Sequence, residues 1–112
     1  MATYLFSVER TLVGNPELSD DNARRLLLLL KAKGHTVKLF ADFVNQVPEG
    51  LRALADELYP KPIRLGACAS VKDDVTLVDD SAEVLTVAVR HGIKPVAAQQ
   101  LGLWLSQEGL CL

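Results

Sequence analysis

The stretch that decides the fold is residues 19–41, which read SDDNARRLLLLLKAKGHTVKLFA. Ser19 followed by two aspartates is typical of a helix N-terminus, and apolar residues then recur at helical spacing. Gly34 is suited to end this helix, and residues 36–41 are rich in strand-forming types. A second β-rich run lies ahead of the helix, at residues 3–8. Strand, helix and strand in this order predict a βαβ unit with parallel strands.

The predicted helix is apolar over more of its circumference than a single sheet contact needs. Its expected buried stripe contains Ala23, Leu26, Leu27 and Leu30. Leu28 and Leu29 fall outside that stripe. They are either two partly exposed leucines or part of a subunit interface.

The rest of the chain continues the alternation of strand and helix. Two segments are ambiguous in the sequence. Residues 71–78 fit a helical turn or an extended piece. Residues 82–90 fit a helix or a strand because several of them are β-branched, but the His-Gly pair that follows favours a helix. The other expected elements are a helix from Pro48 to Pro60, a strand from Pro62 leading into Cys68, a strand at 93–96, a helix at 97–108 and a final strand stub at 110–112. The pattern predicts a three-layer α/β fold.

Size and composition exclude several classes of protein. The 112 residues suit one domain, residues 1–112, and the hydrophobic fraction of 49% predicts a well-filled core. The net charge is −2 without a basic tract, so neither nucleic acid nor an anionic membrane is an expected partner. The longest apolar run, residues 26–30, is too short to span a bilayer. Two cysteines do not form a disulfide framework, which favours a reducing, cytoplasmic location.

The strongest candidate for chemistry is Cys68. It lies in the stretch PIRLGACAS, residues 62–70, where an apolar strand-like run ends in a turn of small residues. Ser70 with Asp73 resembles a helix N-cap, and a helix N-terminus stabilises a thiolate. The alternative is a small, inert, buried thiol, because free cysteine is among the most buried residue types. Cys111, in a terminal apolar run, is predicted to be a core residue.

Four polar residues lie on loops expected to share an edge of the sheet with Cys68. They are Glu9, Arg10, Asp42 and Asn45. The carboxyl edge of a parallel sheet is where ligands bind, so these residues are candidates for substrate binding. The alternative is that they are ordinary polar loop residues.

No metal or cofactor is predicted. His35 and His91 lack the paired spacing of zinc ligands, and the expected role of each is capping or solvation. The acidic residues Asp73, Asp74, Asp79 and Asp80 lack the pattern of a calcium loop, so they are expected to be caps and solvated charge. Walker, Rossmann, hydrolase-elbow and paired-CxxC motifs are all missing from the sequence.

Three pieces of the chain resemble DsrE/DsrF-like proteins, in the same order. The first is KGHTVKLF, residues 33–40, followed by a loop that holds Asp42 and Val44. The second is GACA, residues 66–69, which is similar to the cysteine loop of that family. The third is HGIKPV, residues 91–96, followed by a helix and then QEGL at 107–110. The resemblance extends over nearly the whole chain.

This resemblance implies an α/β/α domain with a mainly parallel sheet of about five strands. It also implies a homo-oligomer, a trimer or hexamer, and a cysteine that carries sulfur as a persulfide between a donor and an acceptor protein. That role falls on Cys68, with Gly66, Ala67 and Ser70 supplying loop groups that stabilise charge. The acidic residues that follow Cys68 oppose thiolate formation. The alternative is therefore a homo-oligomeric binding or scaffolding module with an inert cysteine.

Overall fold

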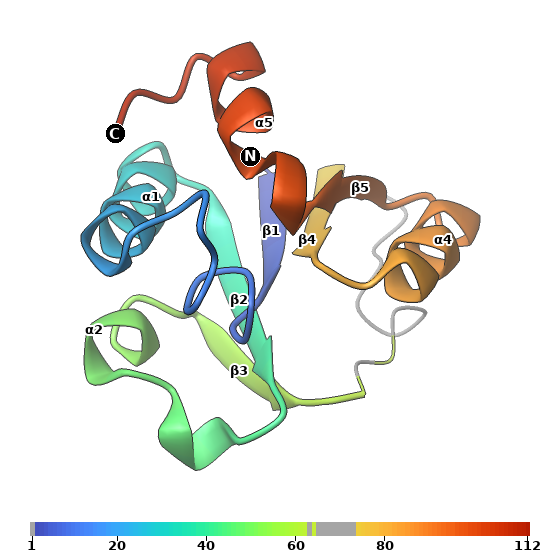
Figure 1. Ribbon diagram of the computed structural model, residues 1–112, viewed down its shortest axis with the longest axis horizontal. Coiled ribbons are helices and arrows are strands. Elements are labelled where there is room, and N and C mark those ends of the chain that lie inside the picture. The colour runs from blue at the N-terminus through green and yellow to red at the C-terminus, as the bar shows by residue number, and fades with distance from the viewer. Residues whose placement is uncertain (1, 63, 65–73) are drawn as a thin grey trace.

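The computed structural model describes residues 2–62, 64 and 74–112 and contains one five-stranded sheet (Figure 1). The strand order is β3-β2-β1-β4-β5, and every neighbouring pair is parallel. The strands are β1 (Ala2–Ser7), β2 (Thr36–Ala41), β3 (Glu57–Pro60), β4 (Asp74–Asp79) and β5 (Lys94–Ala97). The predicted α/β fold with a parallel sheet is confirmed.

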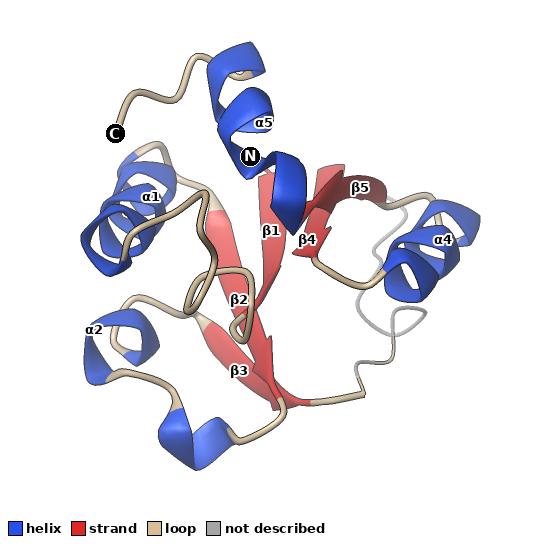
Figure 2. Cartoon of the chain, in the orientation of Figure 1, coloured by secondary structure: helices blue, strands red, loops and turns tan. Residues whose placement is uncertain are grey.

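Helices cover both faces of this sheet (Figure 2). They are α1 (Asp20–Ala32), α2 (Glu49–Arg52), α4 (Ala82–Arg90) and α5 (Leu101–Gln107), with short 3₁₀ turns at Val44–Gln46 and Ala98–Gln100. The first, second and last helices share one face, whereas α4 packs on the other. Among the described residues, no helix has the length and apolar character needed to cross a bilayer.

Alternation along the strands produces two separate apolar cores. Phe6, Leu39 and Val78 point to the face covered by α1, α2 and α5. Their neighbours in sequence, Leu5, Phe40 and Leu77, point to the face covered by α4. Because successive strand residues face opposite sides, a central strand buried on both sides is apolar at most of its positions.

Helix α1 forms as its sequence predicts. The Ser19 hydroxyl accepts a hydrogen bond from the Asn22 N–H, and Gly34 after the helix has a φ of 83°. All four residues of the predicted stripe are buried. Of the two surplus leucines, Leu29 packs against the core, whereas Leu28 is 40% exposed. Only Leu28 therefore contributes surplus apolar surface.

The predicted helix from Pro48 to Pro60 is wrong over its second half. The helix ends at Arg52, and residues 57–60 form β3, so Leu58 lies on a strand. Asp56 determines this change: its carboxylate accepts from the Val37 N–H, and its own N–H donates to the Val37 carbonyl. These bonds anchor the segment to β2 as an edge strand, where a terminal proline is tolerated. The strand β3 was therefore not expected, and the strand predicted from Pro62 into Cys68 lies outside the described residues except for Pro62 and Arg64.

One open alternative is settled, and one later expectation is wrong. Residues 71–78 fitted a helical turn or an extended piece, and residues 74–78 are extended and belong to β4, an interior strand. Residues 110–112 form no strand, and Cys111 is exposed instead of lying in the core. Leu110 and Leu112 turn toward the core, so the residue between them faces outward. Among the described residues the sheet has five strands, and β3 and β4 are the two that the sequence did not predict as strands.

Candidate functional site

The carboxyl ends of all five described strands lie at one edge of the sheet, because every pair is parallel. The chain leaves β1 toward α1 on one face, and it leaves β4 toward α4 on the opposite face. Since β1 and β4 are neighbours, the connections diverge between them. Such a switch point in an open parallel sheet leaves a crevice in which ligands bind.

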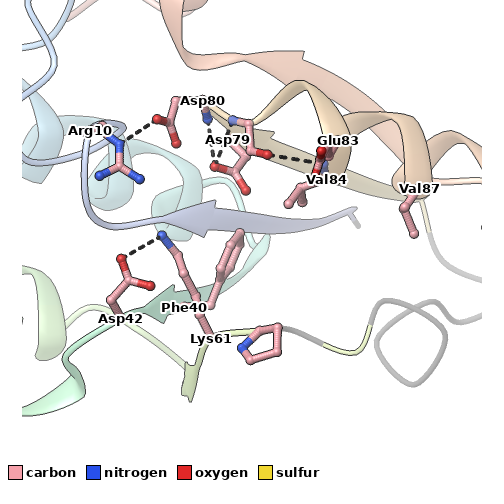
Figure 3. Close-up of a pocket in the computed structure, with 11 residues that line it drawn as sticks. Arg10, Phe40, Asp42, Lys61, Asp79, Asp80, Glu83, Val84 and Val87 are labelled. Carbon is pink, nitrogen blue, oxygen red and sulfur yellow. Dashed lines mark hydrogen bonds and ion pairs between the residues drawn. The ribbon is translucent and has the colours of Figure 1, made fainter.

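A cavity of about 530 Å³ lies at this edge (Figure 3). One part of its wall is apolar and consists of Phe40, Pro62, Val84 and Val87. The other part is polar or charged and consists of Arg10, Asp42, Lys61, Asp79, Asp80, Ser81 and Glu83. The volume falls within the range of small-molecule sites.

Asp79 is the most buried charged group of the cavity wall, with 2% of the residue exposed. Its Oδ1 accepts from the Asp80 N–H at 2.7 Å and from the Ser81 N–H at 3.4 Å. Burial raises the pKa of Asp79 to about 6, and a side-chain hydrogen bond with Asp80 acts in the same direction. Ser81 then caps α4 by accepting from the Val84 N–H. The turn from β4 into α4 therefore holds a carboxyl group at the cavity.

Arg10 reaches this turn from the loop after β1. Its backbone has a φ of 61°, in the left-handed region, and its N–H donates to the Val13 carbonyl at 2.7 Å. The guanidinium Nε donates to the Asp80 carboxylate at 2.6 Å. Burial raises the pKa of Asp80, but the hydrogen bonds from Arg10 and Asp79 together with the positive charge of Arg10 outweigh burial, so this pKa lies below its ordinary value. The ion pair joins the loops that follow β1 and β4.

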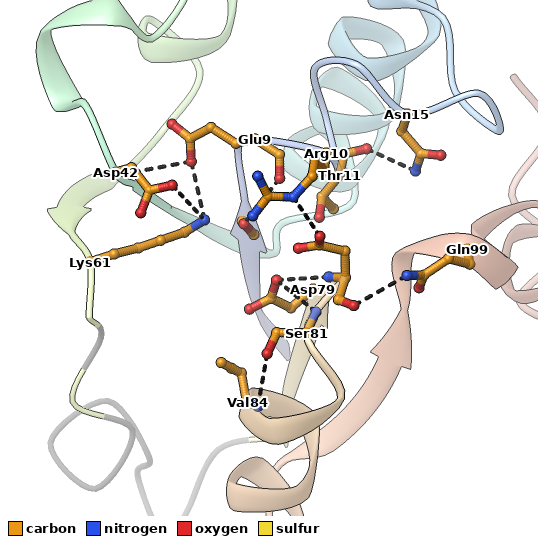
Figure 4. A network of polar contacts seen from close by, with 12 residues as sticks. Glu9, Arg10, Thr11, Asn15, Asp42, Lys61, Asp79, Ser81, Val84 and Gln99 are labelled. Carbon is orange, nitrogen blue, oxygen red and sulfur yellow. Dashed lines mark hydrogen bonds and ion pairs between the residues drawn. The ribbon is translucent and has the colours of Figure 1, made fainter.

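Lys61 joins the loops after β1, β2 and β3 (Figure 4). Its Nζ lies 3.1 Å from the Glu9 carboxylate, 3.9 Å from that of Asp42 and 5.7 Å from the centre of the Phe40 ring. Glu9 also accepts from the Asp42 N–H at 3.1 Å. Burial raises the pKa of Glu9, but the Asp42 N–H and Lys61 together lower it below its ordinary value.

The structure brings together three of the four loop residues proposed from the sequence. Arg10 and Asp42 line the cavity, and Glu9 contacts Asp42 and Lys61. Asn45 is exposed on the 3₁₀ turn after β2 and is not among the described lining residues. The remaining candidates, Gly66, Ala67, Cys68 and Ser70, lie outside the described residues.

Sequence reasoning missed Lys61 and Asp79 as members of this site. Asp79 was expected to be cap or solvated charge; it does accept hydrogen bonds from the turn, but it is buried. The signal was available: Asp79 directly follows the apolar run VTLV and so ends a strand. Because residues 71–78 fitted two conformations, the position of Asp79 at the end of a strand was not recognised. Lys61 was missed because the third strand was expected after it instead of before it.

The described residues contain no group of three or more histidine, cysteine, aspartate or glutamate side chains that could hold a metal ion. His35 lies at the amino end of the sheet, where its Nδ1 accepts from the Ala2 N–H. His91 caps the C-terminus of α4. Both histidines thus have local structural contacts away from the cavity.

Comparison with known proteins supports the fold. No family model matches the chain, and no curated protein matches it. The structure is similar to the crystal structure of an uncharacterized protein from Corynebacterium glutamicum ATCC 13032 Kitasato, with a TM-score of 0.77. The two chains are 21% identical, and the match covers 98% of this chain and 94% of the other. At that identity the likeness shows a shared fold alone.

Proposed function

We propose that the protein is a DsrE/DsrF-like sulfur carrier, or sulfurtransferase, that acts through Cys68. One observation carries the proposal: a cavity lies at the switch point of a parallel sheet, and Pro62 belongs to its wall. Cys68 follows Pro62 closely in the sequence, within the stretch that resembles the cysteine loop of that family. The cavity offers a place where a sulfur donor or acceptor can present its reacting group.

The proposed transfer is a thiol–persulfide exchange. The Cys68 thiolate attacks the sulfane sulfur of a donor persulfide, a new S–S bond forms on Cys68, and the donor leaves as its thiolate. An acceptor thiolate then attacks the sulfane sulfur on Cys68, and Cys68 is released as a thiolate. Neither step needs an external oxidant or reductant, because each breaks one S–S bond and forms another.

Two cations, Arg10 and Lys61, belong to the described cavity wall, and each is already paired with a carboxylate. The proposal therefore rests on the position of the cysteine stretch beside the cavity and not on the charge of its wall. A homo-oligomer, a trimer or hexamer, and a cytoplasmic location complete the proposal. Both follow from the family resemblance and from the cysteine usage.

The exposed thiol of Cys111 shapes the experiment that tests this proposal. An exposed cysteine also reacts with polysulfide. The loading of Cys68 with sulfur must therefore be tested in Cys111→Ser protein. We expect mass spectrometry to find an added sulfur atom on the peptide that contains Cys68 after incubation with a persulfide donor.

The matched control is the opposite variant, Cys68→Ser with Cys111 intact. If the proposal is correct, sulfur on Cys111 alone does not pass to an acceptor thiol, whereas sulfur on Cys68 does. Equal transfer from either cysteine, or no loading of Cys68, would contradict a specific carrier role.

A second candidate function is a homo-oligomeric binding or scaffolding module with an inert cysteine. Exposed apolar side chains on one layer of the fold favour it: Leu28 on α1 and Leu103 on α5 are 40% and 58% exposed. A second copy of the chain would cover this surface. Light scattering of Leu28→Lys protein tests the idea, since the substitution should lower the oligomer mass, and Cys68→Ser should leave it unchanged. An unaltered mass in Leu28→Lys protein would argue against it.

A further inference from the structure

We propose that the cavity at the carboxyl edge of the sheet binds a small organic cation. The ligand is an alkyl- or arylammonium whose charged group lies beside Asp79 and Glu83 and whose carbon skeleton packs on Val84 and Val87. This goes beyond sulfur transfer, because none of the four residues belongs to the cysteine stretch. The pairing of the charged side chains in the cavity wall determines which ligand charge the cavity accepts.

Both cations of the described wall are occupied by carboxylates. Arg10 is paired with Asp80, and Lys61 is paired with Glu9 and Asp42. In the part of the chain that the structure describes, neither Asp79 nor Glu83 lies within ion-pair distance of a cation. The unbalanced charge of the described wall is therefore negative, and a positively charged group would neutralise it.

Asp79 is placed to meet such a group. The residue is nearly fully buried, yet its side chain belongs to the cavity wall (Figure 3). The N–H groups of Asp80 and Ser81 donate to its Oδ1, and its carboxyl also shares a hydrogen bond with the Asp80 carboxyl. An ammonium group beside this carboxyl would offset the cost of holding a carboxylate away from water.

The apolar wall explains why the ligand is an organic cation and not a hydrated metal ion. Val84 and Val87 on α4 line the cavity, and Pro62 also belongs to its apolar wall. Glu83, on the same helix, contributes its carboxylate at the exposed rim. A ligand with an apolar body gains from burial against the valines, whereas a hydrated ion does not.

An NMR titration of the isotope-labelled full chain with benzylammonium tests this proposal. Near neutral pH we expect saturable shifts confined to the amides of residues 79–87. Benzyl alcohol and benzoate have the same ring without the positive charge, and we expect each to bind at least about tenfold more weakly. Repeating the titration with Cys68→Ser protein separates this binding from sulfur transfer, and we expect the same affinity.

Two substitutions locate the binding group. Asp79→Asn keeps an oxygen to accept from the Asp80 and Ser81 N–H groups, and it should weaken benzylammonium binding at least about tenfold. Glu83→Gln should weaken it less, and the matched surface change Glu49→Gln should have no effect. If Asp79→Asn fails to fold, the contrast between Glu83→Gln and Glu49→Gln decides. Binding of benzoate as tightly as benzylammonium, shifts outside the cavity, no saturation, or an unchanged affinity in Asp79→Asn or in Glu83→Gln would overturn the proposal.

Discussion

The two ends of the sheet carry charge in different ways. At the amino end, the ion pairs Lys31–Asp56, Lys38–Glu57 and Lys94–Asp74 lie on the surface, each with at least one partner more than a third exposed. At the carboxyl end, Arg10, Lys61 and four carboxylates surround a cavity, and Asp79 there is almost completely buried. Charges of the first kind are screened by water, whereas a buried carboxyl responds strongly to its surroundings.

This difference indicates which end is built for a ligand. Surface ion pairs at the starts of strands pair the charges of long side chains but contribute little to the free energy of unfolding. A buried carboxyl whose burial raises its pKa to about 6 costs folding free energy when it ionises, and such costs are concentrated at functional sites. The comparison predicts that substitutions at the two ends will differ in size and in pH dependence.

The largest expected effect belongs to Asp79→Asn. Because the folded state binds the Asp79 proton more tightly than the unfolded chain, the native protein loses stability as pH rises from about 4 through about 6. The substitution removes this loss, so near pH 7 the variant should be more stable than the native protein by about 1 to 3 kcal/mol. Urea unfolding over a pH series measures the difference, and parallel curves for the two proteins would contradict it.

A second prediction separates the contribution of the Arg10 backbone conformation to stability from that of the Arg10 side chain. Arg10→Gly and Arg10→Ala both lose the ion pair with Asp80, but only glycine adopts a φ of 61° without steric cost. We therefore expect the glycine variant to melt a few degrees higher than the alanine variant. Thermal unfolding of the two variants, followed by circular dichroism, compares them directly. Equal melting temperatures would show that the left-handed backbone costs nothing here.

A smaller effect is expected for Lys61→Met. The substitution leaves Glu9 and Asp42 without their shared cation and should cost about 1 kcal/mol at neutral pH. Glu9 has a lowered pKa, so its stabilisation is present above about pH 4 and is lost as pH falls through the folded value. In the variant, the stability lost as pH falls through this range should be smaller. NMR titration of the Glu9 carboxyl should show a higher pKa, and an unchanged value would exclude Lys61 as its partner.

The smallest effect is expected at the amino end, for Lys31→Met. The Lys31–Asp56 pair is exposed on both sides, so its removal should cost less than about 0.5 kcal/mol, and high salt should abolish the difference. Asp56→Ala should cost more, because Asp56 also accepts from the Val37 N–H that anchors β3. Chemical unfolding at low and high salt measures both. A stability change for Lys31→Met as large in magnitude as the gain expected for Asp79→Asn would break the contrast between the two ends.

Much of the fold could be predicted from local patterns. The cap and stripe of α1, the strand at residues 36–41 and the helix at 82–90 all appear where their residues indicate. The errors occur where local propensity is weak. Residues 57–60 became a strand through bonds from Asp56 to Val37, and Cys111 became exposed because Leu110 and Leu112 occupy the core. Both outcomes depend on contacts between segments distant in the sequence.

The candidate site was only half predictable for the same reason. Arg10 and Asp42 could be proposed because loops after parallel strands share an edge. The place of Asp79 was missed although it follows the run VTLV, because residues 71–78 fitted two conformations and pairing with β1 decides that residues 74–79 form an interior strand. Lys61 could be placed at this edge only if β3 was known to end just before it.

By itself, the sequence determined that strands and helices alternate and that the sheet is parallel, because periodicity and caps act within a few residues. It also singled out Cys68 as the candidate for sulfur chemistry. Only the tertiary structure decided which strands are neighbours, which carboxyl loses its water and which cations are already paired. Those properties arise from packing between distant segments, and burial and pairing have no meaning until the chain has folded.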